Sequence, residues 1–537
     1  MSDPWRIHED EELCAVNKPA GVVTHRARPG GQAGLHEWLC ARTKTRLAIH
    51  HRLDKGTSGV LVFGKTRAAN QRLAAAFSER RLEKRYLLLR RSDPGRPSQE
   101  RCDAALPGGK RRRTAERPAR TDFVRIERGA GWDLWEARPR TGRTHQIRLH
   151  AARLGAPILG DGEYSGAPAA RLFLHAHSLE LPGRPRLEAP LPQAFREVLA
   201  GRSPTDPGLA ALAAREAREL LFDSAETNAY LWIDREHDGF PGLRVERLGD
   251  VGLLLRYDES PSELPRRWLD ALRRVGGLRA LVEQRRPRRG PRSGFRLLRG
   301  ELPAPRFWVR EHGLEYLVDL SPEGCSTGFF LDQRETRRRL LGEDLSGRNV
   351  LNVFAHTGSL SVAAACAGAR TVTLDLSRSY LDWARENMRR NAIDPGEHDF
   401  VHGDALDWLR RFHKKGRRFD LVLCDPPSFA TGRGRRGKKT WSIERDLPLL
   451  VERAARLLAP EGRLLVSTNL RRLRWERFEE RIRAGLAAAD RTGALESDSL
   501  PLDFRSGPAD APYLKLAWIR IDGRGPALAL GRSAHRV

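Results

Sequence analysis

The feature that most constrains the fold is an alternation that begins near residue 306. Short apolar runs alternate there with helical segments of ten or more residues. The runs are Val350–Phe354, Thr371–Leu376, Leu421–Asp425 and Arg463–Thr468. This alternation is typical of a parallel sheet covered by helices. It predicts an α/β domain over about residues 306–521, followed by a tail over residues 522–537.

The chain before residue 306 is organised differently. Residues 1–202 alternate short strand-like runs with helical and arginine-rich segments, and the runs are Leu13–Asn17, Gly59–Phe63 and Arg85–Leu89. Arg202–Pro207 reads as a connector, because Pro and Asp interrupt the periodicity. A helix at Gly208–Phe222 and short strands predict a small domain over residues 208–305, and these strands are Ala229–Asp234, Gly242–Arg247 and Gly252–Tyr257. A length of 537 residues agrees with about three domains.

The charge balance indicates a polyanionic partner. Lys and Arg number 96 against 69 Asp and Glu, which gives a formal net charge of +27. Nucleic acid is the first candidate and an anionic membrane surface the second. Met1–Asp10 is polar and no apolar stretch of about 18 residues occurs, so neither a secretory signal nor a membrane span is expected. The six cysteines form no CxxC pair, which favours reduced thiols in a cytoplasmic protein over a zinc ribbon.

Three segments of the first 202 residues carry the first candidate site. They are the nine residues His51–Gly59 (HRLDKGTSG), the strand-like Glu83–Tyr86, and Thr141–His150 (TGRTHQIRLH). Taken alone, an Asp in a Gly/Ser/Thr loop is most often a turn residue, and an arginine-rich strand is most often a solvated face. Together, and with the following LGAPILGDGEY and FLHAHSLELP runs, the segments resemble the RluA-type pseudouridine synthases over about residues 8–200.

That resemblance implies an α+β fold with a mixed antiparallel sheet and a reaction that isomerises uridine in RNA without a cofactor. It implies that Asp54 is the essential carboxylate, as a nucleophile at C1′ or a base at the 2′ position. Arg148 matches the arginine paired with this carboxylate, which would keep its pKa low under a flipped nucleotide. Tyr86 matches the aromatic residue that packs on the target base and can help to move the C5 proton.

Further basic side chains of these segments are expected to contact substrate. Arg52 and Arg143 suit phosphate or structural contacts, and His145 is a further candidate for the RNA. A metal site built from His145, His150, His175 and His177 is disfavoured, since the spacing fits no HExxH helix and the resembled family uses no metal. We therefore expect no metal.

The second candidate site lies in the alternating C-terminal part. Asn352 and Phe354 belong to an apolar strand that runs into a turn at Gly358 and then a helix, and Asp375 ends the next strand. Ser377 is placed to cap the helix Arg378–Asn391. Asp404 follows a third strand, and a fourth ends in Asp425-Pro426-Pro427-Ser428. A strand, a glycine and a helix alone fit any nucleotide-binding fold, but no GxGxxG occurs and NAD is therefore disfavoured.

The Asp-Pro-Pro tripeptide follows the pattern of methyltransferases that act on planar nitrogens or on rRNA bases. With Thr327–Arg334 (TGFFLDQR) and Asp238–Leu243 (DGFPGL), it resembles the RlmI/RlmK-type 23S rRNA methyltransferases over about residues 226–520. The resemblance implies a Rossmann-like class I fold and S-adenosylmethionine as the cofactor. It implies a cofactor pocket lined by Asn352, Phe354, Gly358, Asp375, Asp404 and Asp425, with Asp425, Pro426, Pro427 and Asn469 toward the base.

The identity of the methylated atom depends on whether a cysteine lies at the second site. Methylation of cytosine C5 requires a Cys thiolate that first adds to C6. The RlmI branch carries that thiol at a strand end where this chain has Ser467-Thr468-Asn469. Cys424 is expected to pack in the sheet and Cys366 in a helix core. The Ser-Thr-Asn run resembles the RlmK branch, which forms N7-methylguanine, so guanine N7 is favoured.

The main expectation is therefore a bifunctional RNA-modifying enzyme whose partner is RNA, with 23S rRNA or an assembly intermediate as the first candidate. Three alternatives stay open. The C-terminal domain could form 5-methylcytosine, it could bind RNA without catalysis, or the whole chain could serve as a ribosome-assembly factor. The basic runs Arg285–Arg296 and Gly432–Lys439, expected as loops, suit either RNA contact or solvent exposure.

Overall fold

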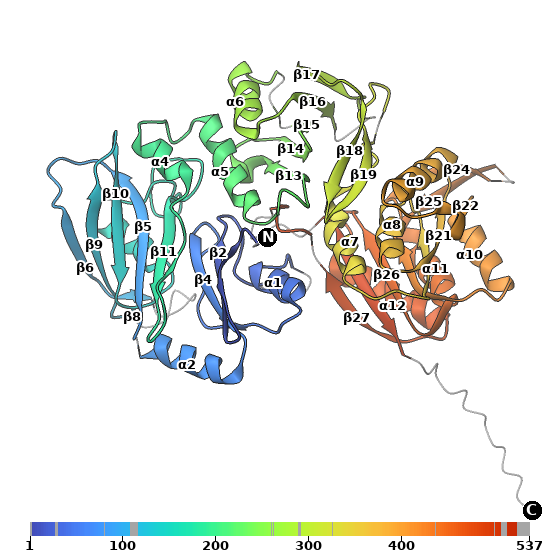
Figure 1. Ribbon diagram of the computed structural model, residues 1–537, viewed down its shortest axis with the longest axis horizontal. Coiled ribbons are helices and arrows are strands. Elements are labelled where there is room, and N and C mark those ends of the chain that lie inside the picture. Colours follow the sequence, from blue (N-terminus) through green and yellow to red (C-terminus); the bar gives the residue numbers. More distant parts are fainter. Residues whose placement is uncertain are drawn as a thin grey trace, which may run out of the picture.

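A computed structural model describes residues 3–26, 31–79, 81–107, 116–258, 260, 263–287, 292–324, 326–434, 437–498, 500–505 and 513–522. Three large sheets follow one another along the chain (Figure 1), and three further sheets among the described residues have two strands each. Among these residues no helix has the length and apolar character needed to cross a membrane. The side chains of Gly432–Lys439 and residues 288–291 lie outside the description, so the predicted contact of both basic runs with RNA is not addressed by it.

The N-terminal part is built on a mixed sheet with the strand order β1-β2-β4-β11-β5-β10-β9-β6, in which β4 and β11 run parallel. The blue and cyan end of Figure 1 shows it. Its elements are β1 (Arg6–Glu9), β2 (Leu13–Lys18), α1 (Leu35–Thr43), β3 (Ala48–Ile49), β4 (Ser58–Gly64), α2 (Arg67–Ser78), β5 (Glu83–Arg91), β6 (Gln99–Asp103), β7 (Leu106–Pro107), β8 (Glu116–Arg117), β9 (Arg120–Glu127), β10 (Trp132–Pro139), α3 (Gln146–Arg153), β11 (Leu174–Glu180), β12 (Leu187–Glu188) and α4 (Gln193–Leu199).

The connector predicted at Arg202–Pro207 leads into a helix, as expected. Helix α5 (Pro207–Glu219) begins with Pro at its first turn, and the Asp206 side chain accepts a hydrogen bond from Leu209 N at 3.0 Å. A small sheet of order β13-β14-β15-β16-β17 follows, and α6 joins its parallel pair β15 and β16. The elements are β13 (Ala229–Asp234), η1 (Arg235–Asp238), β14 (Leu243–Leu248), β15 (Val251–Arg256), α6 (Arg266–Gly276), β16 (Ala280–Arg285) and β17 (Arg296–Gly300).

The C-terminal part has the predicted parallel sheet, with the order β22-β21-β20-β23-β26-β28-β27 and two antiparallel strands at its end. Its elements are β18 (Arg306–Glu311), β19 (Leu314–Asp319), η2 (Leu331–Gln333), α7 (Arg334–Leu341), β20 (Asn349–Val353), α8 (Ser359–Cys366), β21 (Arg370–Asp375), α9 (Arg378–Arg390), η3 (Pro395–Glu397), β22 (Asp399–His402), α10 (Ala405–Lys414), β23 (Phe419–Cys424), β24 (Phe429–Gly434), β25 (Gly437–Ser442), α11 (Ile443–Ala455), β26 (Leu458–Thr468), α12 (Trp475–Ala488), β27 (Gly493–Asp498) and β28 (Lys515–Ile521). Within the run expected as a loop, residues 432–434 and 437–439 instead belong to β24 and β25, whose backbones pair in register.

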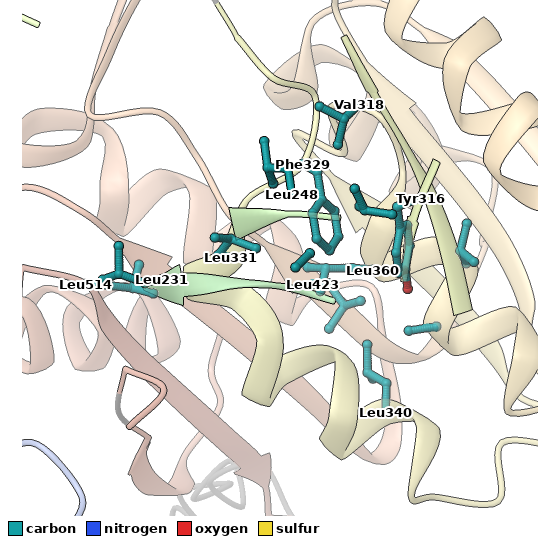
Figure 2. Close-up of a cluster of buried hydrophobic side chains, with 14 of the residues drawn as sticks. Leu231, Leu248, Tyr316, Val318, Phe329, Leu331, Leu340, Leu360, Leu423 and Leu514 are labelled. Atoms are coloured by element: carbon teal, nitrogen blue, oxygen red, sulfur yellow. The ribbon is translucent and has the colours of Figure 1, made fainter. Parts of the chain in front are cut away.

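The hydrophobic cores do not stop at the boundaries between the three sheets. One core joins Leu231 and Leu248 of the small sheet to Phe329, Leu360 and Leu423 of the C-terminal part. Figure 2 shows these side chains gathered between the two units. A second core joins strands β2 and β4 of the N-terminal part to α5 and to the other face of the small sheet. The small sheet therefore packs against both of its neighbours.

Buried ion pairs lie where the small sheet meets the C-terminal part. Glu311, Arg334 and Arg337 are almost completely buried. The Glu311 carboxylate accepts hydrogen bonds from Arg334 Nε at 3.1 Å and from Arg337 Nη2 at 3.0 Å. Burial alone would raise the pKa of Glu311, but the two guanidinium groups bring it below its ordinary value. The cluster is fully paired, so removing one member leaves buried charge without a partner.

We expect Glu311→Ala to lower the free energy of unfolding by about 3–5 kcal/mol, because two buried guanidinium groups lose their counter-charge. Chemical denaturation followed by tryptophan fluorescence measures the change. The matched control is Glu479→Ala, which removes an exposed pair with Arg483 on α12 and should cost less than about 1 kcal/mol. Equal effects for the two variants would contradict a stabilising role of the buried cluster.

Candidate active sites

The first site is a pocket of about 520 Å³ in the N-terminal part. Three chain segments line it: the loop before β4, the first half of β5, and the segment from the end of β10 into α3. All six residues predicted for this site border the pocket, namely Arg52, Asp54, Tyr86, Arg143, His145 and Arg148. The structure thus brings together segments that lie about 90 residues apart in the chain.

The Asp54 loop is held by its backbone. Leu53 is buried in the core shared with the small sheet. Thr24 Oγ1 donates to Leu53 O at 3.0 Å and accepts from Leu53 N at 3.2 Å. On the other side of Asp54, Thr57 N donates to Asp54 O at 3.1 Å. The Asp54 side chain itself is 26% exposed and faces the pocket.

Two basic groups approach the Asp54 carboxylate. His145 Nε2 lies 3.6 Å from Oδ1, and Arg148 Nη1 lies 3.9 Å from Oδ2. These distances are longer than hydrogen bonds, so the Arg148 guanidinium acts on Asp54 mainly through its charge. A substrate group can still enter between them.

The tight partners of Arg148 are two acids that the sequence analysis did not assign. Its Nε and Nη2 donate to the two oxygens of Asp161 at 2.8 and 2.7 Å, and Nη2 also reaches Glu163 at 2.9 Å. Burial opposes the Arg148 charge, but Asp161, Asp54 and Glu163 together raise its pKa. The bidentate pair fixes the guanidinium plane and leaves Nη1 toward Asp54. Asp161 and Glu163 both belong to the LGAPILGDGEY run, which follows the TGRTHQIRLH motif.

His145 is oriented by its backbone and by Tyr164. It lies at the start of α3 with a φ of 54°, a conformation that few residues other than glycine adopt. Its Nδ1 is 2.8 Å from the Tyr164 hydroxyl, which leaves Nε2 for Asp54. Arg148 stacks over the same Tyr164 ring, 4.9 Å from its centroid. Tyr164 therefore holds both basic groups beside the carboxylate.

Tyr86 lies on β5, opposite Ala137 of β10 and Ala176 of β11. Burial raises the pKa of its phenol, and the nearby Asp54 charge raises it further. The phenol is therefore protonated at neutral pH and can donate a hydrogen bond or stack on a base.

The remaining predicted side chains take different positions. Arg52 is exposed at the rim, while Arg143 is half-buried, and its Nε has no hydrogen-bond partner among the described residues. His150 and His175 each have a protein partner at both ring nitrogens, and His177 Nδ1 lies 3.0 Å from Ala189 O. Within the described part of the chain, no group of His, Cys, Asp and Glu could hold a metal ion.

The second site lies at the carboxyl ends of β20, β21 and β23. Phe354, His356 and Gly358 follow β20 with positive φ values of 60°, 51° and 73°. A Cβ at Gly358 would come within 2.6 Å of the Ala384 Cβ, so only glycine lets the turn pack on α9. Asn352 is buried beneath this turn. Its Nδ2 donates to Ser361 Oγ at 3.0 Å, and its Oδ1 has no described partner.

The two predicted carboxylates Asp375 and Asp404 already bind backbone groups. Asp375 accepts from His356 N at 2.7 Å and from Ser377 N at 2.8 Å, and burial raises its pKa. Asp404 accepts from Asp407 N at 2.9 Å and caps α10. Ser377 caps α9, as predicted. The glycine cradle and the carboxylates at successive strand ends suit the nucleoside of S-adenosylmethionine.

Asp425 follows β23, next to the turn, and its backbone N lies 3.5 Å from Val353 O. Burial raises the pKa of Asp425 to about 6, although the Ser467 hydroxyl donates to it and lowers the value. The neighbouring Asp332 carboxylate contributes to the increase. Pro426 is buried and Pro427 is exposed, with its carbonyl accepting from Trp441 Nε1 at 2.7 Å. The sequence analysis assigned no role to Asp332 or Trp441.

Asn469 and the cysteines complete the second site. Asn469 Oδ1 accepts from Ser428 Oγ at 2.6 Å, so this residue does lie beside the Asp-Pro-Pro turn.

Cys424 is fully buried in β23, as expected, and burial strongly raises the pKa of its thiol. Cys366 was expected in a helix core, which is wrong: it is exposed at the end of α8. Cys325 lies outside the described residues.

Known families match both parts of the chain. Residues 12–153 match the RNA pseudouridylate synthase family, and residues 269–479 match the S-adenosylmethionine-dependent methyltransferase family. The chain therefore carries an RluA-type pseudouridine synthase domain followed by a Rossmann-like methyltransferase domain, whose cofactor is S-adenosylmethionine.

Curated relatives bear the name ribosomal RNA large subunit methyltransferase K/L. The protein from Photobacterium profundum is 33% identical over 287 residues, which cover 51% of this chain and 38% of that protein. The protein from Allochromatium vinosum is 37% identical over 264 residues, which cover 47% of this chain and 34% of that protein. The chain thus matches little more than a third of the length of these relatives.

Solved structures agree for the methyltransferase part. A putative methyltransferase complexed with SAH has a TM-score of 0.52 and 26% identity, covering 58% of this chain and 80% of that one. A putative S-adenosylmethionine-dependent methyltransferase from Streptococcus mutans has a TM-score of 0.51 and 26% identity, with the same coverage.

Proposed function

We propose that the chain is a bifunctional RNA-modifying enzyme that forms pseudouridine and methylates guanine N7 in 23S rRNA. The observation that carries the proposal is the presence of two separate carboxylate sites, Asp54 beside two basic groups and Asp425 beside the glycine turn. The ribosomal RNA names of the relatives support the substrate. A cytoplasmic location is part of the same proposal.

In the first site, Asp54 acts on the ribose of a flipped uridine, either at C1′ or at the 2′ position. Arg148 places a positive charge and His145 a ring nitrogen beside the carboxylate, and Arg148 is itself held by Asp161. Tyr86 packs on the released uracil, and its protonated phenol is a donor beside C5. Arg52 and Arg143 at the rim bind RNA phosphates.

In the second site, S-adenosylmethionine supplies the methyl group. Gly358 and Phe354 form the cradle, and Asp375 and Asp404 face the nucleoside. Buried Asn352, whose Nδ2 donates to Ser361 Oγ, lies beneath the turn. Asp425 accepts hydrogen bonds from the guanine N1 and N2 groups, while Pro426, Pro427 and Asn469 shape the base pocket. This arrangement turns N7 toward the methyl group.

Guanine N7 is favoured over cytosine C5 by the chemistry of the strand end. Ser467 occupies the position where a thiol would be needed, and its hydroxyl donates to Asp425. Cys424, the neighbouring thiol, is enclosed in the core behind the sheet. Guanine N7 already carries an in-plane lone pair and requires no covalent activation.

The division into functional units remains part of this proposal. We place a pseudouridine synthase domain at residues 1–202, a linking and RNA-contact domain at 208–305, the methyltransferase domain at 306–521 and a tail at 522–537. The separate sheets of the three parts support this division. Exposed arginines on α6 support RNA contact by the linking domain.

The test is to map both modifications on 23S rRNA from cells with and without the gene, and then to restore them with purified protein. Pseudouridine is mapped by its chemical adduct and N7-methylguanosine by mass spectrometry of digested RNA. Loss and recovery of one nucleotide of each kind supports the proposal. Unchanged 23S rRNA in the deletion strain would contradict it.

RNA affinity should fall steeply with salt, because a chain with a net charge of +27 releases counterions from many phosphates. We expect log Kd to rise linearly with log salt, with a slope of about 4 or more between 50 and 200 mM KCl. Filter binding of a 23S rRNA fragment measures the slope. A flat dependence would show that the positive charge reflects composition alone.

A further inference from the structure

A short segment of the methyltransferase domain reaches the N-terminal part next to Gly21. Leu500–Arg505 connects β27 toward β28, and its residues belong to two different cores. Leu500 and Phe504 pack in the core of the methyltransferase and the small sheet, whereas Leu502 packs in the core that contains Leu53. The segment therefore lies where all three units meet.

Arg505 at the end of this segment is 10% exposed and is bound on both sides. Its Nη1 lies 3.3 Å from Asp238 Oδ1, and its backbone N donates to Asp234 Oδ2 at 3.0 Å. Its guanidinium also lies directly against Gly21, where any added side chain would overlap it. Arg505 thus fills the space between the small sheet and the segment 19–24 of the N-terminal domain.

Segment 19–24 in turn carries the Asp54 loop. Gly21 N donates to Lys55 O at 2.7 Å, one residue after Asp54. Thr24 binds the backbone of Leu53, one residue before it. Buried Lys18 donates to both Val22 O at 2.7 Å and Lys55 O at 3.3 Å. The loop therefore rests on segment 19–24, and segment 19–24 rests on Arg505.

Buried charged residues hold the rest of the Leu500–Arg505 segment in place. Asp503 Oδ1 accepts from Arg334 Nη1 at 2.7 Å, and Asp503 Oδ2 accepts from Leu231 N at 2.8 Å. Arg218 donates to Asp503 O at 3.2 Å and forms a bidentate pair with Asp238, at 3.0 and 2.7 Å. These fully buried pairs leave the segment little freedom to shift, so Arg505 is a fixed support.

We propose that Arg505, contributed by the methyltransferase domain, is a positioning residue for pseudouridine formation. It fixes the Gly21 segment and through it the Asp54 loop, and the proposal rests on the pseudouridine synthase function given above. Arg505 lies behind the loop and contacts no substrate. Its loss should therefore reduce kcat while the KM for RNA is unchanged, since small displacements of a reacting group slow the chemical step.

The experiment compares full-length Arg505→Ala, Arg505→Lys and the control Arg520→Ala, which removes an exposed arginine of β28. For Arg505→Ala we expect about a 10-fold lower pseudouridine kcat with KM within about 2-fold of wild type. Arg505→Lys should recover most of kcat, because lysine can still pair with Asp238. The control should match wild type. The methyl-transfer rate, measured on the same preparations, should be unchanged in all three variants.

Two results would overturn the proposal. One is an Arg505→Ala kcat equal to that of the control. The other is a decrease in both reaction rates and in the melting temperature of Arg505→Ala that Arg505→Lys does not restore. That result would indicate only a lost structural contact. Hydrogen exchange at the Gly21, Leu53 and Thr57 amides gives an independent readout. It should accelerate in Arg505→Ala, and unchanged exchange would also overturn the proposal.

Failure of the proposed function is distinguishable from failure of this inference. If the wild-type chain forms no pseudouridine on any RNA, the proposed function is wrong. The exchange rates of the same three amides then decide whether Arg505 positions the loop. If the wild type is active and either kcat or exchange fails to respond to Arg505→Ala, the inference alone is wrong.

Discussion

Replacement of Asp54 by alanine should abolish pseudouridine formation, lowering the rate at least about 10²-fold, while RNA binding stays within a few fold. Among the described residues that line the pocket, Asp54 is the acid that approaches both His145 and Arg148. Glu163 also approaches these two basic groups, but it does not line the pocket. The nearby acids cannot replace Asp54, because Asp161 is fully buried in its bidentate pair and Glu163 is engaged with the same arginine. Tritium release from C5-labelled uridine in RNA measures the rate.

The matched control is Glu83→Ala. Glu83 lines the same pocket but pairs with Arg85 at 3.0 Å, and no basic group of the catalytic cluster contacts it. Its removal should change the rate by no more than about 3-fold, as expected for a surface ion pair. Residual activity of Asp54→Ala above about 1% of wild type would contradict the role of the carboxylate.

The residues predicted for the first site lie together in one pocket because the motifs that carry them are local. The strands around it follow alternating apolar runs, and three motifs name Asp54, Tyr86, His145 and Arg148, all of which line one pocket. Distances, however, are not encoded in a motif. The expected Arg148–Asp54 pair is 3.9 Å long, and the close partner is Asp161, since a guanidinium binds a carboxylate best in the bidentate geometry that only the folded turn provides.

The second site shows a different limit. Asp375 and Asp404 were correctly placed at successive strand ends, but their side chains also bind the backbone of the turn and the start of α10. A pattern of apolar and polar residues cannot distinguish a carboxylate that binds a ligand from one that caps a helix. It also misplaced Cys366, which is the last residue of α8 and is exposed.

The contacts among the three units are the least predictable part. Arg334, Arg337 and Glu311 have the composition of a surface helix and strand end, yet they are buried between the small sheet and the methyltransferase domain. Charged residues are buried only when they are paired. Such pairing depends on residues that are distant in sequence, such as Asp503 and Arg334. The periodicity of apolar residues along the sequence carries no information about it.

The methyl-transfer reaction should depend on Asp425 and on no cysteine. Asp425→Ala should lower the methylation rate by about 10²-fold, because a guanine edge loses its charged acceptor in a buried site. Cys424→Ala should leave the rate within about 2-fold if the sheet survives, since its thiol is enclosed and protonated. Transfer of labelled methyl groups from S-adenosylmethionine to RNA measures both rates.

The pH dependence of methylation provides the sharper test of this role. Burial raises the pKa of Asp425 to about 6, so the carboxylate is ionised above that pH and protonated below it. A protonated carboxyl cannot accept from both guanine donors, and the rate should therefore fall as pH decreases through about 6. Asp425→Asn should be slow and should lose this pH dependence, because its amide does not titrate there.

Mass spectrometry of the product identifies the methylated atom. The presence of 5-methylcytidine that disappears in Cys424→Ala would overturn the assignment to guanine N7, because carbon methylation requires a thiolate at C6.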